Sequence, residues 1–196
     1  MMKKVLLLFI SIILLSLPFI GISQYYLHII IMILIWSFIY TSWSLVGRFR
    51  LTSLGHGAFM SMGAYGTGLL WNYAQLSPLI GIPLTLLFTA VIAIIISYAC
   101  FSFRIVGHYF ALATLALSEV TKLFIVATRD YTGGSLGLTP NPPNEVSELI
   151  SFQFSDRETF YYIALFAWIF GLIIWKIIDR SMIKFALEAI AEDEEA

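Results

Sequence analysis

The side chains that could do chemistry in this 196-residue chain are few, and no catalytic pattern joins them. An intramembrane serine hydrolase would need a nucleophilic serine, such as Ser61 or Ser118, with a histidine base in reach. HExxH, GxGxxG and Walker sequences are absent. His56, a lone histidine among glycines, forms no metal site, and we interpret it as structural. We therefore expect a non-enzyme with no cofactor and no metal, and any ATP hydrolysis must come from another chain.

Charged and polar side chains do, however, interrupt the apolar segment 107–127. The polar ones lie within an arc of about 160° on a helical wheel: His108, Thr114, Ser118, Glu119, Thr121 and Lys122. The opposite side is apolar and suits lipid: Tyr109, Phe110, Ala113, Ala116, Leu117, Val120 and Phe124. A charge at membrane depth costs at least about 2.5 kcal/mol, so it should face inward with a partner. The charges at 119 and 122 can pair within one helix. Either this pair only stabilises the bundle or a subunit contact, or the polar face, with Thr114 and Ser118, borders a substrate path.

A stripe of small residues marks the preceding segment, SLGHGAFMSMGAYGTG. Within about 80° of arc this stripe contains Ser53, Gly57, Ser61, Ala64 and Gly68. Small side chains let another helix approach closely, and packing of this kind drives helix association in lipid. Helix packing is the favoured interpretation, and a wall of a narrow substrate path is the alternative.

Composition indicates an integral membrane protein. Hydrophobic residues make up 60% of the chain and charged residues 12%, with a mean hydropathy of +0.90, whereas soluble domains are about 25% charged. A net charge of −1 suggests no nucleic-acid partner. Cys100, the single cysteine, excludes an intrachain disulfide and a cysteine metal cluster, and we interpret it as a packing residue.

The elements that must position these residues are membrane-spanning helices of roughly 20 residues. Six segments qualify: about 5–22, 27–46, 54–71, 79–103, 106–127 and 160–178. We therefore predict an all-α polytopic fold, with a transmembrane domain over 1–180 and a cytoplasmic helix over 181–196. A cleaved signal peptide over 1–23 is a less favoured alternative for the first segment.

Basic residues set the predicted orientation. With a cytoplasmic N-terminus, one side holds Lys3, Lys4, Arg48, Arg50, Arg104, Lys176, Arg180 and Lys184. The other side holds Arg129 and Arg157, so the positive-inside rule places both termini in the cytoplasm. The loop over about 128–159 is then external. Within it, TGGSLGLTPNPP begins at Thr132, and Gly133, Gly134 and Gly137 permit positive φ. It predicts a shaped turn, either a tight connector or a contact surface.

The last residues predict an amphipathic helix on the cytoplasmic side. Its apolar stripe follows helical spacing: Met182, Phe185, Ala186, Ala189 and Ile190. Its acidic residues include Glu188, Glu192 and Asp193. An acidic helix is poorly suited to anionic lipid, so a groove in a partner protein is favoured over the membrane surface.

Four of these motifs together resemble one family. SLGHGAFMSMGAY, GHYFALATLALSEVTKLF, TGGSLGL and the closing RSMIKFALEAIAEDEEA are similar, in this order, to the LivM-like permease subunits of branched-chain amino acid ABC transporters. The resemblance covers about 43–196. Three positions depart from the family pattern. Ala191 stands where an arginine is usual, Phe185 stands near a usual basic residue, and Lys122 replaces a more frequent arginine but keeps its charge.

The resemblance implies a function, with 1–180 as a transmembrane permease domain and 181–196 as an incomplete cytoplasmic coupling helix. Such a chain would pair with a sister, LivH-like permease, two cytoplasmic ATPase subunits and an extracytoplasmic solute-binding protein in a prokaryotic inner membrane. Its substrates would be Leu, Ile and Val, or, as the alternative, other amino acids, amides or urea. Family members continue beyond the coupling segment, so the resemblance predicts a C-terminally truncated chain. The competing hypothesis is therefore a non-transporting membrane fragment or scaffold.

Overall fold

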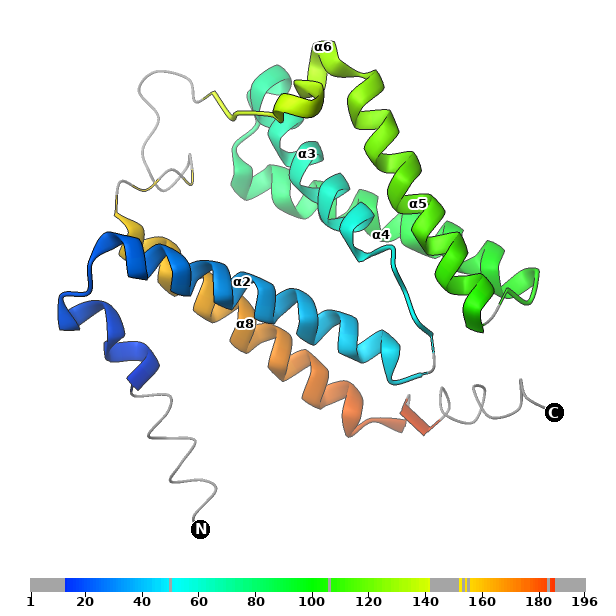
Figure 1. The fold of residues 1–196 in the computed structure, drawn as a ribbon, viewed down its shortest axis with the longest axis horizontal. Helices are drawn as coiled ribbons and strands as arrows, with labels where there is room; N and C mark the ends of the chain where they lie inside the picture. The colour runs from blue at the N-terminus through cyan, green and yellow to red at the C-terminus, as the bar shows by residue number, and fades with distance from the viewer. Residues whose placement is uncertain are drawn as a thin grey trace. The chain divides into compact units, whose positions relative to one another are not determined.

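The computed structural model describes residues 13–49, 51–105, 107–141, 152, 154, 156–182 and 184–185, and these residues form helices and connections without a strand. Figure 1 shows the chain as a succession of helices. In chain order they are η1 (Leu17–Ile20), α2 (Gln24–Gly47), α3 (His56–Ala74), α4 (Pro78–Ser102), α5 (Gly107–Ala127), α6 (Arg129–Thr132), η2 (Gly134–Leu136) and α8 (Arg157–Asp179). The all-α prediction is confirmed for this part of the chain.

Four of the described helices, namely α2, α4, α5 and α8, are long and apolar enough to cross a membrane. They coincide with four of the six predicted spans. The span predicted over 54–71 forms as helix α3, but its glycines and polar side chains keep it out of this group. Most of the span predicted over 5–22 lies outside the described residues. Where the structure describes it, a turn of helix over 13–16 leads into η1, which ends at Gly21 with φ of 72°.

The chain divides into two compact units. The first comprises 1–41 and 154–177, and the second comprises 42–153 and 178–196. The core of the first unit joins α2 to α8. Its buried side chains are Leu27, Ile31 and Leu34 from α2 and Tyr161, Ala164 and Leu165 from α8. Spacings of three and four residues place each set on one helix face. The hydroxyl of Tyr161 donates to the Leu14 carbonyl at 2.6 Å, so this buried polar group is satisfied.

The second unit depends on the close approach of α3 and α4, the two helices with the most extensive mutual contact. A Cβ added at Gly66 would stand 2.8 Å from Cγ2 of Thr85, and one added at Gly81 would stand 3.5 Å from Cγ2 of Thr67. Each helix thus places a glycine against a threonine of the other. The two threonine hydroxyls are hydrogen-bonded at 2.9 Å. Such small-residue contacts are what brings helices together in lipid, where hydrophobicity provides no drive between them.

The predicted small-residue stripe is therefore not the face that packs on α4. Only its ends pack within the described residues: Ser53 is buried, and Gly68 lies against the side chain of Leu138. A Cβ at Gly57 would meet no atom within 4 Å, and Ala64 is exposed. The packing contact with α4 instead uses Gly66 and Thr67, which lie five and six residues after Ser61 and so on another side of the helix.

We expect Gly66→Ala to destabilise the second unit by about 1–3 kcal/mol, because the added methyl group would force α3 and α4 apart. Gly63→Ala is the matched control. A Cβ at this position on the same helix meets nothing within 4 Å, so the gain in helix propensity should leave stability unchanged or slightly raised. Equilibrium unfolding of the purified protein in mixed micelles measures both changes. Equal stability of the two variants would contradict this account of the contact.

Candidate functional site

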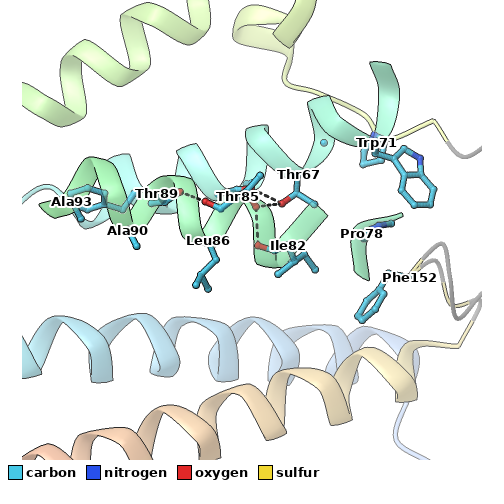
Figure 2. A pocket seen from close by; sticks show the side chains of 15 residues that line it. Thr67, Trp71, Pro78, Ile82, Thr85, Leu86, Thr89, Ala90, Ala93 and Phe152 are labelled. Carbon is cyan, nitrogen blue, oxygen red and sulfur yellow. Dashed lines mark hydrogen bonds between the residues drawn. The ribbon is translucent and has the colours of Figure 1, made fainter. Parts of the chain in front are cut away.

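A pocket of about 770 Å³ lies between α3 and α4 in the second unit. Figure 2 shows its lining side chains along both helices, from Ala93 and Ala90 at one end to Trp71 and Pro78 at the other. Most of the lining is apolar, and no charged side chain contributes to it. Its size falls in the range of small-molecule sites, which are generally concave and mostly apolar.

Three threonines supply the polar part of the lining. Each hydroxyl lies within hydrogen-bond distance of a carbonyl of its own helix: Thr67 of Gly63 at 2.8 Å, Thr85 of Gly81 at 2.8 Å and Thr89 of Thr85 at 2.7 Å. Because Thr67 and Thr85 also bond to each other, one of these two gives its proton to the other threonine and the other gives its proton to its own helix. A hydroxyl oxygen that donates its proton still has acceptor capacity. The pocket can therefore hold an apolar group and offer weak acceptors to a donor, but it supplies no charge to pair with an ion.

One end of the pocket is closed by the segment that follows the glycine turn. The Trp71 indole donates to the Asn141 carbonyl at 3.1 Å. The side chain of Asn72 binds the same segment twice, donating to the Thr139 carbonyl at 3.1 Å and accepting from the Asn141 amide at 2.9 Å. Pro140 is thereby held in the pocket lining. The predicted external loop thus contacts the site through the end of α3.

The glycine turn has the conformation that the sequence predicts. Gly133, Gly134 and Gly137 have φ values of 75°, 58° and 82°. At Gly133 a side chain is excluded on steric grounds as well, because its Cβ would overlap the Gly137 carbonyl. Thr132 is buried and holds the turn, donating to the Ile125 carbonyl at 2.6 Å and accepting from the Gly134 amide at 3.1 Å. The prediction of a shaped turn is confirmed.

Three residues predicted to line the substrate path, Ser53, Thr114 and Ser118, meet at the segment that leads into α3. The hydroxyl oxygen of Thr114 accepts from the Leu54 amide, and the hydroxyl of Ser118 donates to the Leu54 carbonyl, both at 3.0 Å. The side chain of Ser53 accepts from the Gly55 amide at 3.3 Å. Helix α5 therefore satisfies backbone groups at a helix entrance. In this structure the side chains of Ser53, Thr114 and Ser118 fix the backbone of the segment that leads into α3.

The polar side of α5 needs one correction. Phe110, predicted on the lipid side, is buried together with Thr114 and Thr121, because positions four and seven residues apart share a face. Glu119 and Lys122 pair as predicted, at 3.4 Å, but both side chains are more than half exposed within this chain. Only groups outside the described residues could cover the side chains of Glu119 and Lys122.

The remaining predicted site residues divide into those near the pocket and those outside the described chain. Ala64 and Gly68, of the small-residue stripe, line the pocket, whereas Gly57 and Ser61 do not. Among the coupling residues, Met182 and Phe185 are exposed, at 84% and 62%. The others lie outside the described residues: Ala186, Glu188, Ala189, Ile190, Glu192 and Asp193. No group of metal-binding side chains occurs in the described part of the chain.

Sequence reasoning missed the pocket threonines and the two residues that anchor the loop, Trp71 and Asn72. One signal for the threonines was available. Thr85 and Thr89 stand four residues apart in an otherwise apolar segment, and Thr67 stands four residues after a glycine in α3. No sequence pattern could pair Asn72 with 139–141, because that contact joins residues about seventy positions apart.

Comparison with known proteins places this geometry in context. Residues 25–196 match the family model described as branched-chain amino acid transport system, permease component. The chain is 27% identical over 169 residues to the high-affinity branched-chain amino acid transport system permease protein LivM of Salmonella typhimurium, and equally to that of Escherichia coli. The alignment covers 76% of this chain and 39% of each relative, so the chain spans well under half of their length. No solved structure matches the chain significantly.

We expect Thr114→Val to destabilise the protein by about 1–3 kcal/mol, because the buried contact loses its acceptor and leaves the Leu54 amide unpaired. Thr121→Val is the matched control: Thr121 is also buried on the same helix, but within the described residues its hydroxyl bonds to the Leu117 carbonyl of its own helix and to no other segment. Unfolding titrations of both variants measure the difference. A loss of similar size in both would show that the bond to the 53–55 segment contributes nothing of its own.

Proposed function

The chain belongs to the family of branched-chain amino acid transport permeases, and we propose that it is a membrane subunit of an ATP-driven importer of leucine, isoleucine and valine. A permease component is a non-catalytic transport subunit. The observation that carries the proposal is the pocket between α3 and α4, whose apolar, uncharged lining suits a branched aliphatic side chain. Other amino acids, amides and urea are alternative substrates that a competition assay separates.

The proposed substrate path follows the open face of α3 and continues along the pocket. Ala64 and Gly68 belong to both, and Gly57 and Ser61 extend the face toward the start of the helix. The pocket offers no charge to the ammonium and carboxylate groups of an amino acid, and burying them unpaired would be costly. We therefore infer that their partners come from the Glu119 and Lys122 pair of a polar α5 face or from the sister permease.

The wider assembly follows from the family. We propose that the chain pairs with a sister permease, receives substrate from an extracytoplasmic solute-binding protein and is driven by two cytoplasmic ATPase subunits. The basic residues on one side support a cytoplasmic N-terminus in a prokaryotic inner membrane. The glycine turn would then face outward, where its position over the pocket suits a segment that substrate passes.

Filling the pocket tests the path. We expect Ala90→Trp to lower leucine uptake about tenfold, because an indole in the pocket competes with the substrate for space. Ile94→Trp is the matched control, since Ile94 lies one turn further along α4, is 67% exposed and does not line the pocket. Uptake of labelled leucine into proteoliposomes holding the chain with its partner subunits is the measurement, with isoleucine, valine, asparagine and urea as competitors.

Two results would count against the proposal. Equal uptake by both tryptophan variants would remove the pocket from the path. Absence of uptake by the unaltered chain with its partners, under conditions where the complex assembles, would favour the scaffold hypothesis.

The coupling segment allows a second test. We expect Ala189→Arg to abolish uptake while the complex still assembles, because a guanidinium would stand in the apolar stripe that meets the ATPase. Ala191→Arg is the matched control, because it places the same group two residues on, where relatives of this chain usually have arginine. Both positions lie outside the described residues. Co-purification of the ATPase subunits reports assembly, and undiminished uptake by Ala189→Arg would contradict the coupling role.

A further inference from the structure

A cluster of three charged side chains lies at the end of α8. Nη1 of Arg48 stands 2.5 Å from Oδ1 of Asp179, and Nζ of Lys184 stands 3.3 Å from the same oxygen. Arg48 follows the last residue of α2, Asp179 is the last residue of α8, and Lys184 belongs to the coupling segment that comes next. One carboxylate therefore binds cations from two parts of the sequence that lie far apart along the chain.

The cluster fixes which face of the coupling segment points outward. The side chain of Lys184 is only 20% exposed, because it is turned toward the carboxylate. Met182 and Phe185 stand three residues apart, share one helix face, and are largely exposed. Lys184 lies on a different face of the same turn. Holding this lysine toward the carboxylate leaves the apolar face outward, with the Phe185 ring flanking the cluster at 5.7 Å from Nζ of Lys184 and Met182 the more exposed of the two.

We propose that Asp179 is a positioning residue, which presents the apolar face of the coupling segment to the ATPase by holding Arg48 and Lys184 together. The inference rests on the proposed function, because it assigns the ATPase as the partner of that face. Through the bond to Arg48, it also ties the start of the coupling segment to the end of α2. A displacement of the segment would then pull on a membrane helix through the carboxylate.

The cluster controls the orientation of the coupling segment and contributes little to the stability of the fold. Its carboxylate and guanidinium are about 30% exposed, and ion pairs of such exposure contribute little to global stability. An exposed apolar face, in contrast, is driven to cover itself wherever it can. Without the carboxylate of Asp179, the segment loses one restraint on its rotation, and its apolar residues turn more readily toward lipid or protein.

Uptake per ATP hydrolysed, measured in proteoliposomes with the partner subunits, tests the coupling. We expect Asp179→Asn to lower this ratio about three- to tenfold while the complex stays assembled and ATP hydrolysis continues. Asp179→Glu should restore most of the ratio, because it keeps the carboxylate. Asp156→Asn is the matched control: it makes the same change in an exposed residue just before α8 begins.

Orientation is measured separately, without transport. In a Cys100→Ser background, the Met182→Cys variant is labelled with a membrane-impermeant maleimide in inside-out vesicles that contain the chain without ATPase subunits. We expect fast labelling with Asp179 present and labelling slowed about threefold in Asp179→Asn, because the face then turns away from water. Asp156→Asn should leave the rate unchanged.

The two measurements separate failure of this inference from failure of the proposed function. Unchanged labelling and an unchanged ratio of uptake to hydrolysis in Asp179→Asn would overturn the positioning role. A parallel loss of assembled complex in Asp179→Asn and Asp179→Glu would also overturn it, because it would show a purely structural role. If the unaltered chain shows no uptake while labelling still depends on Asp179, the proposed function fails and the orientation by Asp179 stands.

Discussion

The contact between α3 and α4 is the constraint on which the second unit depends. At Gly66 and Gly81 each helix lacks a side chain where the other has a threonine, and the two hydroxyls meet across the interface. Water does not compete for hydrogen bonds in a lipid environment, and close backbone approach gives dispersion contacts that bulky side chains would prevent. The pocket lies beside this contact, because Thr67 and Thr85 belong to both.

Uncharged hydroxyl groups form most of the side-chain hydrogen bonds described in this unit. Thr89 donates its proton to its own helix, Thr67 and Thr85 bond to each other, and their oxygens line the pocket as acceptors. Thr114 and Ser118 instead satisfy the backbone at the start of α3. A threonine or serine in an apolar helix therefore has two structural uses, and only the neighbouring backbone decides between them. This division leaves the charged residues free for tasks at the helix ends.

Helix ends are where this chain places its long-range contacts. Asn72 and Trp71 bind the segment after the glycine turn at one end of α3, and Asp179 binds two cations at the end of α8. The segment after the glycine turn and the residues that follow α8 are thus each attached to a helix end by polar groups.

Sequence periodicity and residue type determined the helices themselves, the positive φ values of the glycine turn and the pairing of Glu119 with Lys122. These depend on neighbours in the sequence, so they can be read locally. Tertiary structure alone decided which small residues pack. Gly66, not the stripe centred on Ser61, meets α4, and Phe110 is buried beside Thr114. It also decided that Asp179 and Arg48 meet. The reason is physical: a helical pattern fixes which residues share a face, but which face meets a partner depends on the balance of all contacts that the partner offers.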